Sequence, residues 1–176
     1  MYEDKLNAVA GLNVVHLRAG DFMENLLVQI GVIRTMGIAA GPLRADLKLH
    51  MIAAEDIGTY AADLLLRRDF NGKQTSELQG QRDLTMAEAA PILGKAIGKP
   101  ELQYRQAPNA QFRAAMIQQG MSADVADLML EMTDAMNSGH MRALEPRSAK
   151  NTTPTSLEDF AVKVFAPAYQ RVVRVA

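Results

Sequence analysis

Four residues that could contact a small ligand follow one short apolar segment near the start of the chain. Arg18, Gly20, Phe22 and Asn25 come directly after the β-branched run 12–17. Arginine and asparagine supply hydrogen-bond donors, phenylalanine supplies a flat apolar face, and glycine lets a backbone or a ligand approach closely. In open α/β sheets, ligands bind beyond the carboxyl ends of the strands. The spacing therefore predicts a ligand-binding turn, although a plain strand–helix connection would explain the same residues.

A methionine-rich segment is the second candidate for ligand contact. Five apolar residues fall on one face of a predicted helix: Val125, Leu128, Met129, Met132 and Met136. Methionine is flexible and polarisable, so such a face suits a flat apolar substrate. Met129, Met132 and Met136, together with Phe22, are predicted to line a substrate pocket. The same pattern is more often a core face or a subunit contact, and both interpretations stay open.

Side chains that could carry nucleophilic, acid–base or metal chemistry are few. The chain has no cysteine, which excludes disulfides, thiolate ligands and a cysteine nucleophile. His16, His50 and His140 are far apart and lack metal-ligand spacing, so we expect packed, hydrogen-bonded histidines. Asp56 is expected to be a helix N-cap rather than a ligand-facing carboxylate. No catalytic residue and no metal ligand is predicted.

The elements that must position these residues alternate between strand and helix over the first 108 residues. Apolar runs predict short strands at 12–17, 47–53, 75–78 and 102–105. The first is apolar on both faces, which is typical of a buried parallel strand. Helices are expected after an Asp21 N-cap, after Glu55 and Asp56, and from a Thr85/Glu88 capping box. A glycine-rich loop is expected between the first helix and the second strand.

From residue 109 onward the pattern is helical. Helices are predicted over 111–119, from a Ser122 cap to residue 138, and from a Thr155/Glu158 capping box. This order predicts an α/β fold: a partial Rossmann-like sheet of about four short, mostly parallel strands with helices, followed by a three-helix C-terminal cap. We expect 1–176 to form a single domain, with a partial α/β layer over 1–108 and a helical, substrate-side cap over 109–176.

Four segments, in order, carry a resemblance to a known family. GLNVVHLRAGDFMEN at 11–25, MIAAEDIG at 51–58, QGQRDLTMAE at 79–88 and TPTSLEDF at 153–160 resemble stretches of NmrA-like proteins, members of the atypical short-chain dehydrogenase/reductase group. That group includes NAD(P)H-dependent quinone and isoflavone-type reductases, and regulators that bind the dinucleotide as a signal. The resemblance implies a Rossmann-like fold and NAD(P)H as the cofactor. It places Arg18, Gly20, Phe22 and Asn25 near the nicotinamide end of the cofactor pocket.

The chain departs from the family pattern at the dinucleotide loop. In the family a G-x-x-G-x-x-G turn sets the pyrophosphate on a helix N-terminus, and no stretch of these 176 residues matches it. The resemblance begins partway through the family pattern, so we expect the C-terminal, substrate-side part of an NmrA-like protein with no cofactor of its own. By itself, this part is expected to be a non-catalytic small-molecule binding or regulatory module. The alternative is part of an NAD(P)H-dependent quinone- or carbonyl-reducing enzyme, active only when the missing N-terminal half is supplied.

Bulk composition limits the partners. Hydrophobic residues make up 48% of the chain, and 19 lysines and arginines face 20 acidic residues for a net charge of -1, which argues against a nucleic-acid surface. No apolar run reaches the roughly 18 residues of a membrane span, and the first residues lack a signal-peptide pattern, so no membrane partner and a cytoplasmic location are expected. An exposed sheet edge predicts a homodimer or higher oligomer through the N-terminal strand or the methionine-rich helix. A small apolar ligand is the other predicted partner.

Overall fold

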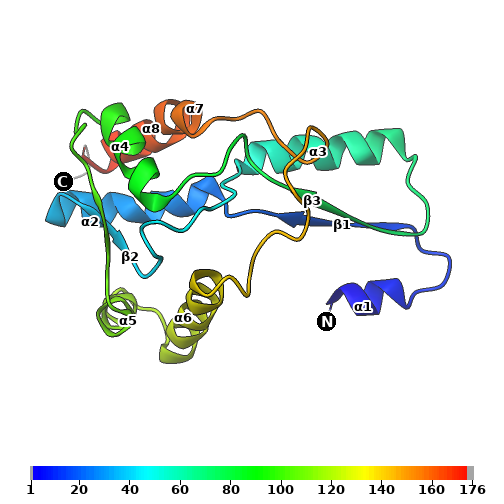
Figure 1. Cartoon of the computed structure of the whole chain (residues 1–176), viewed down its shortest axis with the longest axis horizontal. Coiled ribbons are helices and arrows are strands. Elements are labelled where there is room, and N and C mark those ends of the chain that lie inside the picture. Colours follow the sequence, from blue (N-terminus) through cyan, green and yellow to red (C-terminus); the bar gives the residue numbers. More distant parts are fainter. Residues whose placement is uncertain (1, 174–176) are drawn as a thin grey trace.

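The computed structural model describes residues 2–173 and has an α/β architecture (Figure 1). Its helices and strands follow one another along the chain in this order: α1 (Tyr2–Asn7), β1 (Val14–Ala19), the 3-10 helix η1 (Met23–Val28), α2 (Gln29–Met36), β2 (Ala39–Gly41), α3 (Ala54–Arg67), β3 (Lys73–Leu78), α4 (Met86–Ala96), β4 (Tyr104–Gln106), α5 (Asn109–Gln118), α6 (Ala123–Asn137), α7 (Leu157–Phe160), the π-helix η2 (Ala161–Phe165) and α8 (Ala166–Val173). The predicted fold class is confirmed.

The four strands pair in parallel as two separate two-stranded sheets. β1 pairs with β3 in the register Val14 to Lys73 through Ala19 to Leu78, and β2 pairs with β4. The strands predicted at 75–78 and 102–105 correspond to β3 and β4. β2 lies where a loop was expected, because its sequence Ala-Ala-Gly has no β-branched residue to signal a strand.

The strand predicted over 47–53 is wrong. This segment is a loop held at two points by isolated bridges, Leu49 with Leu84 and Phe22 with Ile52. Met51 and Ile52 are fully buried in it. Its apolar run therefore reflects burial between neighbouring elements, which a sequence pattern does not distinguish from a short buried strand.

The packed lobe consists of α2, β2, α4, β4, α7, η2 and α8, which lie together in Figure 1. Ile33 from α2, Leu93 from α4, and Leu157, Phe160 and Phe165 from the last helical segment are almost completely buried in its core. The Thr85 capping box predicted for α4 is present, with Thr85 Oγ1 accepting from the Glu88 amide at 3.1 Å and Glu88 accepting from the Thr85 amide at 2.8 Å. The last helix thus packs against α4 rather than against α5 and α6.

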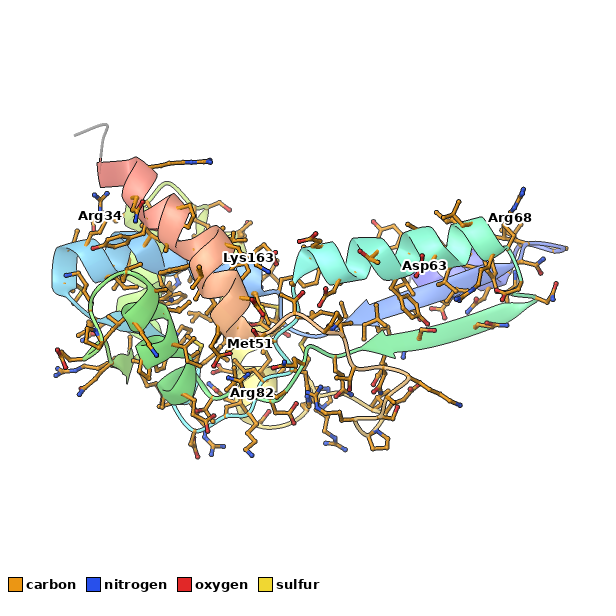
Figure 2. The ribbon with its side chains drawn as sticks, turned by 90° about the horizontal axis from the view of Figure 1, so that it is seen from above. Arg34, Met51, Asp63, Arg68, Arg82 and Lys163 are labelled. Atoms are coloured by element: carbon orange, nitrogen blue, oxygen red, sulfur yellow. The ribbon has the colours of Figure 1, made fainter. Side chains whose placement is uncertain are left out.

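The sheet arm consists of α1, β1, β3 and α3, and it extends away from the packed lobe. Figure 2 shows α3 running alongside the two strands, with Arg68 at its far end. No residue of β1 is buried, and in β3 only Glu77 and Leu78, next to the lobe, are buried. The expectation of a strand buried on both faces is therefore wrong.

Alternation along the strands explains this exposure. Tyr60 of α3 donates to Ser76 of β3 at 3.3 Å, so Ser76 and the residues in step with it face α3. On the opposite face, His16 hydrogen-bonds Asn7 at 2.9 Å and Arg18 pairs with Glu3 at 2.6 Å, both in α1. One face of β1 is thus polar, and the short helix α1 lies against it.

Three predicted caps are wrong, and each of these side chains has another role or partner. Asp21 does not cap a helix, since η1 begins after Phe22 without a side-chain cap. Asp56 lies inside α3, whose first amide, Ala54, donates to Glu24 at 3.1 Å. Asp56 accepts instead from the hydroxyl of Thr155 at 2.7 Å, and Ser156 is the N-cap of α7. Thr155 therefore links α3 to the last helical segment.

α5 and α6 form a separate helical pair. Their small core contains Met116, Ala126 and Leu130, and Ser122 caps α6 as predicted by accepting from the Val125 amide at 3.3 Å. The predicted apolar face of α6 is not its buried face, because Leu128 is 63% and Met129 40% exposed. Within residues 2–173 no helix has both the length and the apolar character that a membrane crossing needs.

Candidate functional site

A cavity of about 740 Å³ lies where the sheet arm meets α6. One wall comes from the carboxyl ends of β1 and β3 and the residues that follow them, and the other from the second half of α6 and the segment 139–144. Leu47, Lys48 and His50 of the buried loop close one side. This is the position at which parallel sheets present ligand sites.

Two glycines at the strand ends let the loop 47–53 approach this closely. A Cβ atom on Gly20 would overlap the carbonyl oxygen of His50, and one on Gly80 would overlap the carbonyl oxygen of Met51. Gly20 also donates its amide to Leu78 at 2.9 Å. The role that the structure gives Gly20 is therefore close packing of His50 against the end of β1.

All four residues of the predicted ligand-binding turn line the cavity: Arg18, Gly20, Phe22 and Asn25. Arg18 is already paired with Glu3, and Asn25 donates to Asp21 at 3.0 Å. Phe22 is 41% exposed, so much of its ring surface is available to a ligand. Their contact with a cofactor or substrate stays a prediction.

The methionine face divides between two environments. Met132 and Met136 line the cavity, and Met136 also packs against the main core, whereas Met129 is not among the lining residues. Met141, from the segment after α6, lines the cavity as well. The sequence did not point to the segment 139–144, because it belongs to no helix or strand and carries no motif.

Glu77 fixes part of that segment in place. Its buried carboxylate accepts from the backbone amides of Leu144 at 2.9 Å and Glu145 at 2.7 Å. Gln79, two residues later, donates to the carbonyl of Glu145 at 2.8 Å. The end of β3 therefore holds the chain that forms the opposite wall of the cavity.

Asp21 is the carboxylate of this site whose charge is least favoured. Burial raises the pKa of Asp21, and the hydrogen bond from Asn25 opposes this shift only in part. Desolvation penalises the ionised form of a carboxyl group. The ionised form of Asp21 is therefore less stable in the folded chain than in water.

His50, which lines the cavity, forms a cluster with Asp83 and Arg147 that was not expected from the sequence. His50 Nδ1 lies 2.7 Å from Asp83 Oδ1, and Arg147 hydrogen-bonds the same carboxylate and the carbonyl of Gly80. Burial acts to raise the pKa of Asp83, but the hydrogen bonds from Arg147 and His50 outweigh it and hold the pKa below its ordinary value. The three residues are 33 and 64 positions apart in sequence, so no local spacing could have revealed them.

The residues of this site do not by themselves fit a dinucleotide. The space beside the Cα of Gly20 is occupied by the carbonyl group of His50. Arg18 and Asn25 are paired with Glu3 and Asp21. A pyrophosphate group binds free backbone amides at the start of a glycine-rich helix. The chain that follows β1 and lines the cavity forms the 3-10 helix η1 instead. Within residues 2–173, no group of three or more histidine, aspartate or glutamate side chains could hold a metal ion.

Comparison with known proteins gives a family match over most of the chain. The model of the NmrA-like family matches residues 8–161. No curated protein sequence gives a significant match.

Several solved structures share the fold. An NADPH-dependent quinone oxidoreductase from Escherichia coli, solved with NADPH, aligns with a TM-score of 0.74 and 25% identity over 92% of this chain and 57% of its own. NmrA, a negative transcriptional regulator solved with NAD, aligns with a TM-score of 0.69 and 15% identity over 97% of this chain and 58% of its own. A nucleoside-diphosphate-sugar epimerase from Staphylococcus aureus aligns with a TM-score of 0.71 and 22% identity over 92% of this chain and 56% of its own. The chain thus spans a little over half the length of these relatives.

Proposed function

The chain belongs to the NmrA-like family. We propose that it is a small-molecule-binding module of that family, with a site for a flat, mainly apolar ligand and without a dinucleotide-binding loop of its own. The observation that carries the proposal is the cavity at the junction of the sheet arm and α6. Its volume of about 740 Å³ lies within the range of small-molecule sites.

The lining favours an apolar ligand. Phe22 offers an aromatic face from one wall, and Met132, Met136 and Met141 offer flexible thioethers from the other. Methionine adapts to ligands of different outline and makes favourable contacts with aromatic rings. A ring system held between Phe22 and the methionines would bury apolar surface on both of its faces.

The test is the binding of 2-methoxynaphthalene, followed by its fluorescence, to the wild type and two matched variants. Met132→Ala removes a side chain from the cavity wall, while Met129→Ala removes the same side chain from the same helix outside the cavity. The two methionines are similarly exposed, at 39% and 40%. We expect Met132→Ala to weaken binding by about five-fold to ten-fold, since contacts of one apolar side chain contribute about 1 kcal/mol or more. Met129→Ala should bind as the wild type does, and an equal loss in both variants would count against the cavity.

A second candidate function is favoured by the likeness to the quinone oxidoreductase. At 25% identity over 92% of this chain, that likeness is compatible with a reductase in which another chain or segment supplies the dinucleotide-binding strands. In such an assembly the cavity would hold the substrate, and Arg18, Phe22 and Asn25 would border the cofactor. Calorimetric titration with NADPH and NADH tests what the two candidates share, because neither expects binding to this chain alone. They differ once the chain or segment that carries the dinucleotide-binding strands is added, since only the second candidate then expects NADPH-dependent reduction.

A further inference from the structure

His50 has one ring nitrogen engaged and one free. Nδ1 is 2.7 Å from Asp83, and Nε2 has no hydrogen-bond partner within the described residues 2–173. The side chain is 29% exposed, and His50 lines the cavity. The free nitrogen therefore belongs to a ring that is fixed on one side and borders ligand space on the other.

Asp83 fixes which tautomer is present. Arg147 donates to this carboxylate and keeps it ionised, so that Asp83 can only accept hydrogen bonds. Nδ1 of His50 must then carry the hydrogen that it donates to Asp83. In the neutral ring Nε2 is left as a lone-pair acceptor, as in other carboxylate–histidine pairs.

Other polar groups around the cavity are less suited to accept a hydrogen bond from a ligand. Arg18 is paired with Glu3, Glu77 accepts from two backbone amides, and Asp21 accepts from Asn25. The other charged or titratable lining residues are Lys48, His140 and Arg142. His140 is exposed, and among residues 2–173 no carboxylate hydrogen-bonds its ring, so its ring is not fixed as that of His50 is.

We propose that His50 binds the hydroxyl group of an aromatic alcohol in the cavity, accepting its hydrogen bond at Nε2, with Asp83 as the positioning residue that fixes the ring. This inference rests on the proposed ligand-binding function and specifies the class of ligand: a phenol or naphthol rather than an unsubstituted arene.

A ligand pair and two histidine variants test the proposal. 2-Naphthol and 2-methoxynaphthalene have the same ring system, but only the first can donate a hydrogen bond. We expect the wild type to bind 2-naphthol about ten-fold more tightly than the ether, since a net hydrogen bond contributes about that much to affinity. His50→Phe keeps a flat ring and should bring this ratio close to one. His16→Phe, at a histidine that hydrogen-bonds Asn7 and is not among the lining residues, should leave the ratio unchanged.

A measurement on the His50 ring itself tests whether Asp83 positions it. Nitrogen NMR of the histidine side chains should show the Nδ1–H tautomer for His50 in the wild type, and a mixture of tautomers in Asp83→Ala. Addition of 2-naphthol should shift the Nε2 resonance of His50, and addition of the ether should not. These spectra of the wild type also decide the proposal if His50→Phe fails to fold.

The outcomes are distinct. If the ether binds and 2-naphthol binds no more tightly, or if His50→Phe keeps the preference, the assignment of His50 is wrong and the apolar site stands. If neither compound binds the wild type, the proposed function fails and this inference fails with it.

Discussion

The packed lobe and the sheet arm differ in how far their helices are covered by other elements. In the packed lobe α4 buries Met86, Ala89, Ala90, Leu93 and Gly94, so that one whole side of the helix lies in the core. In the sheet arm the longer helix α3 buries only Asp56, at the end next to the lobe. Leu65 and Leu66 of α3 are 68% and 79% exposed.

The cavity lies beside the less covered of these two regions, where the sheet arm meets α6. The sheet arm supplies one wall through the ends of β1 and β3, and α6 supplies part of the other. Met136 of α6 lines the cavity and also packs against the core of the packed lobe. A weakly covered element next to a well-packed one is typical of sites that bind a ligand or a second chain. The contrast between the regions therefore bears directly on the function we propose.

The largest expected difference comes from one substitution made in both helices. Leu93→Ala in α4 should lower the free energy of unfolding by about 2–5 kcal/mol, because it leaves a cavity in a closed core. Leu66→Ala in α3 should change it by less than about 0.5 kcal/mol, since the side chain already contacts water. Urea denaturation of both variants measures the difference. A comparable loss for Leu66→Ala would mean that α3 is covered in solution.

Two glycine-to-alanine substitutions form a second matched pair, and we expect their effects on stability to have opposite signs. A Cβ on Gly94 would overlap the carbonyl oxygen of Lys99, whereas one on Gly58 would meet nothing within 4 Å. Gly94→Ala should therefore destabilise by more than about 1 kcal/mol through forced backbone shifts. Gly58→Ala should stabilise by about 0.5–1 kcal/mol, because alanine is the better helix former. Thermal unfolding followed by circular dichroism would reveal the two signs.

The free edge of β1 should be covered by a second copy of the chain. The amides of Val14 and Gly20 donate toward β3, so by the two-residue period those of Val15 and Leu17 point to the open edge. We expect size exclusion with light scattering to give a dimer, and Val15→Pro, which removes one edge amide, to shift it toward the monomer. Val15→Ala loses the same side chain but keeps the amide, and it should stay dimeric. A wild type that is monomeric at all concentrations would contradict this assembly.

The smallest expected effect concerns two carboxylates beside the cavity. The pKa of Asp21 is raised above its ordinary 3.8, so this group costs folded-state stability as pH rises from 3.8 through its folded value. Asp21→Asn should be more stable than the wild type at neutral pH, by about 1 kcal/mol, and should lose this advantage in acid.

Asp83 has the opposite sign. Because its pKa is lowered, it contributes stability above the ordinary 3.8, and this contribution is lost as pH falls through the folded value. Asp83→Asn should therefore be less stable than the wild type at neutral pH. Denaturant titrations at several pH values measure both variants, and equal signs would show that the two environments are not as described.

Local signals in the sequence predicted two helix caps correctly, but the caps predicted at Asp21, Asp56 and Thr155 are wrong, and these signals did not predict the burial of the strands. Thr85 with Glu88, and Ser122, were predictable because a cap and its partner lie within three residues of each other. The burial of β1 was not, because it depends on which elements cover the strand and not on the strand itself. The buried loop 47–53 was mistaken for a strand for the same reason.

The candidate site shows the same limit. The turn from Arg18 to Asn25 could be located from its residues and their spacing, and it does line the cavity. The pairing of His50 with Asp83 and Arg147 could not, because it depends on Gly20 and Gly80 allowing the loop to pass close to both strand ends. Contacts between segments that are far apart in the sequence leave no periodic pattern in it.

The most direct test of the account is methyl NMR of the protein labelled at its 11 methionines, titrated first with 2-methoxynaphthalene and then with NADPH. We expect the naphthalene to shift the methyl signals of Met132, Met136 and Met141 and to leave those of Met129 and the core residue Met86 in place. NADPH should shift none of them. Shifts centred on other methionines, or saturable shifts with NADPH alone, would contradict a ligand module without its own dinucleotide site.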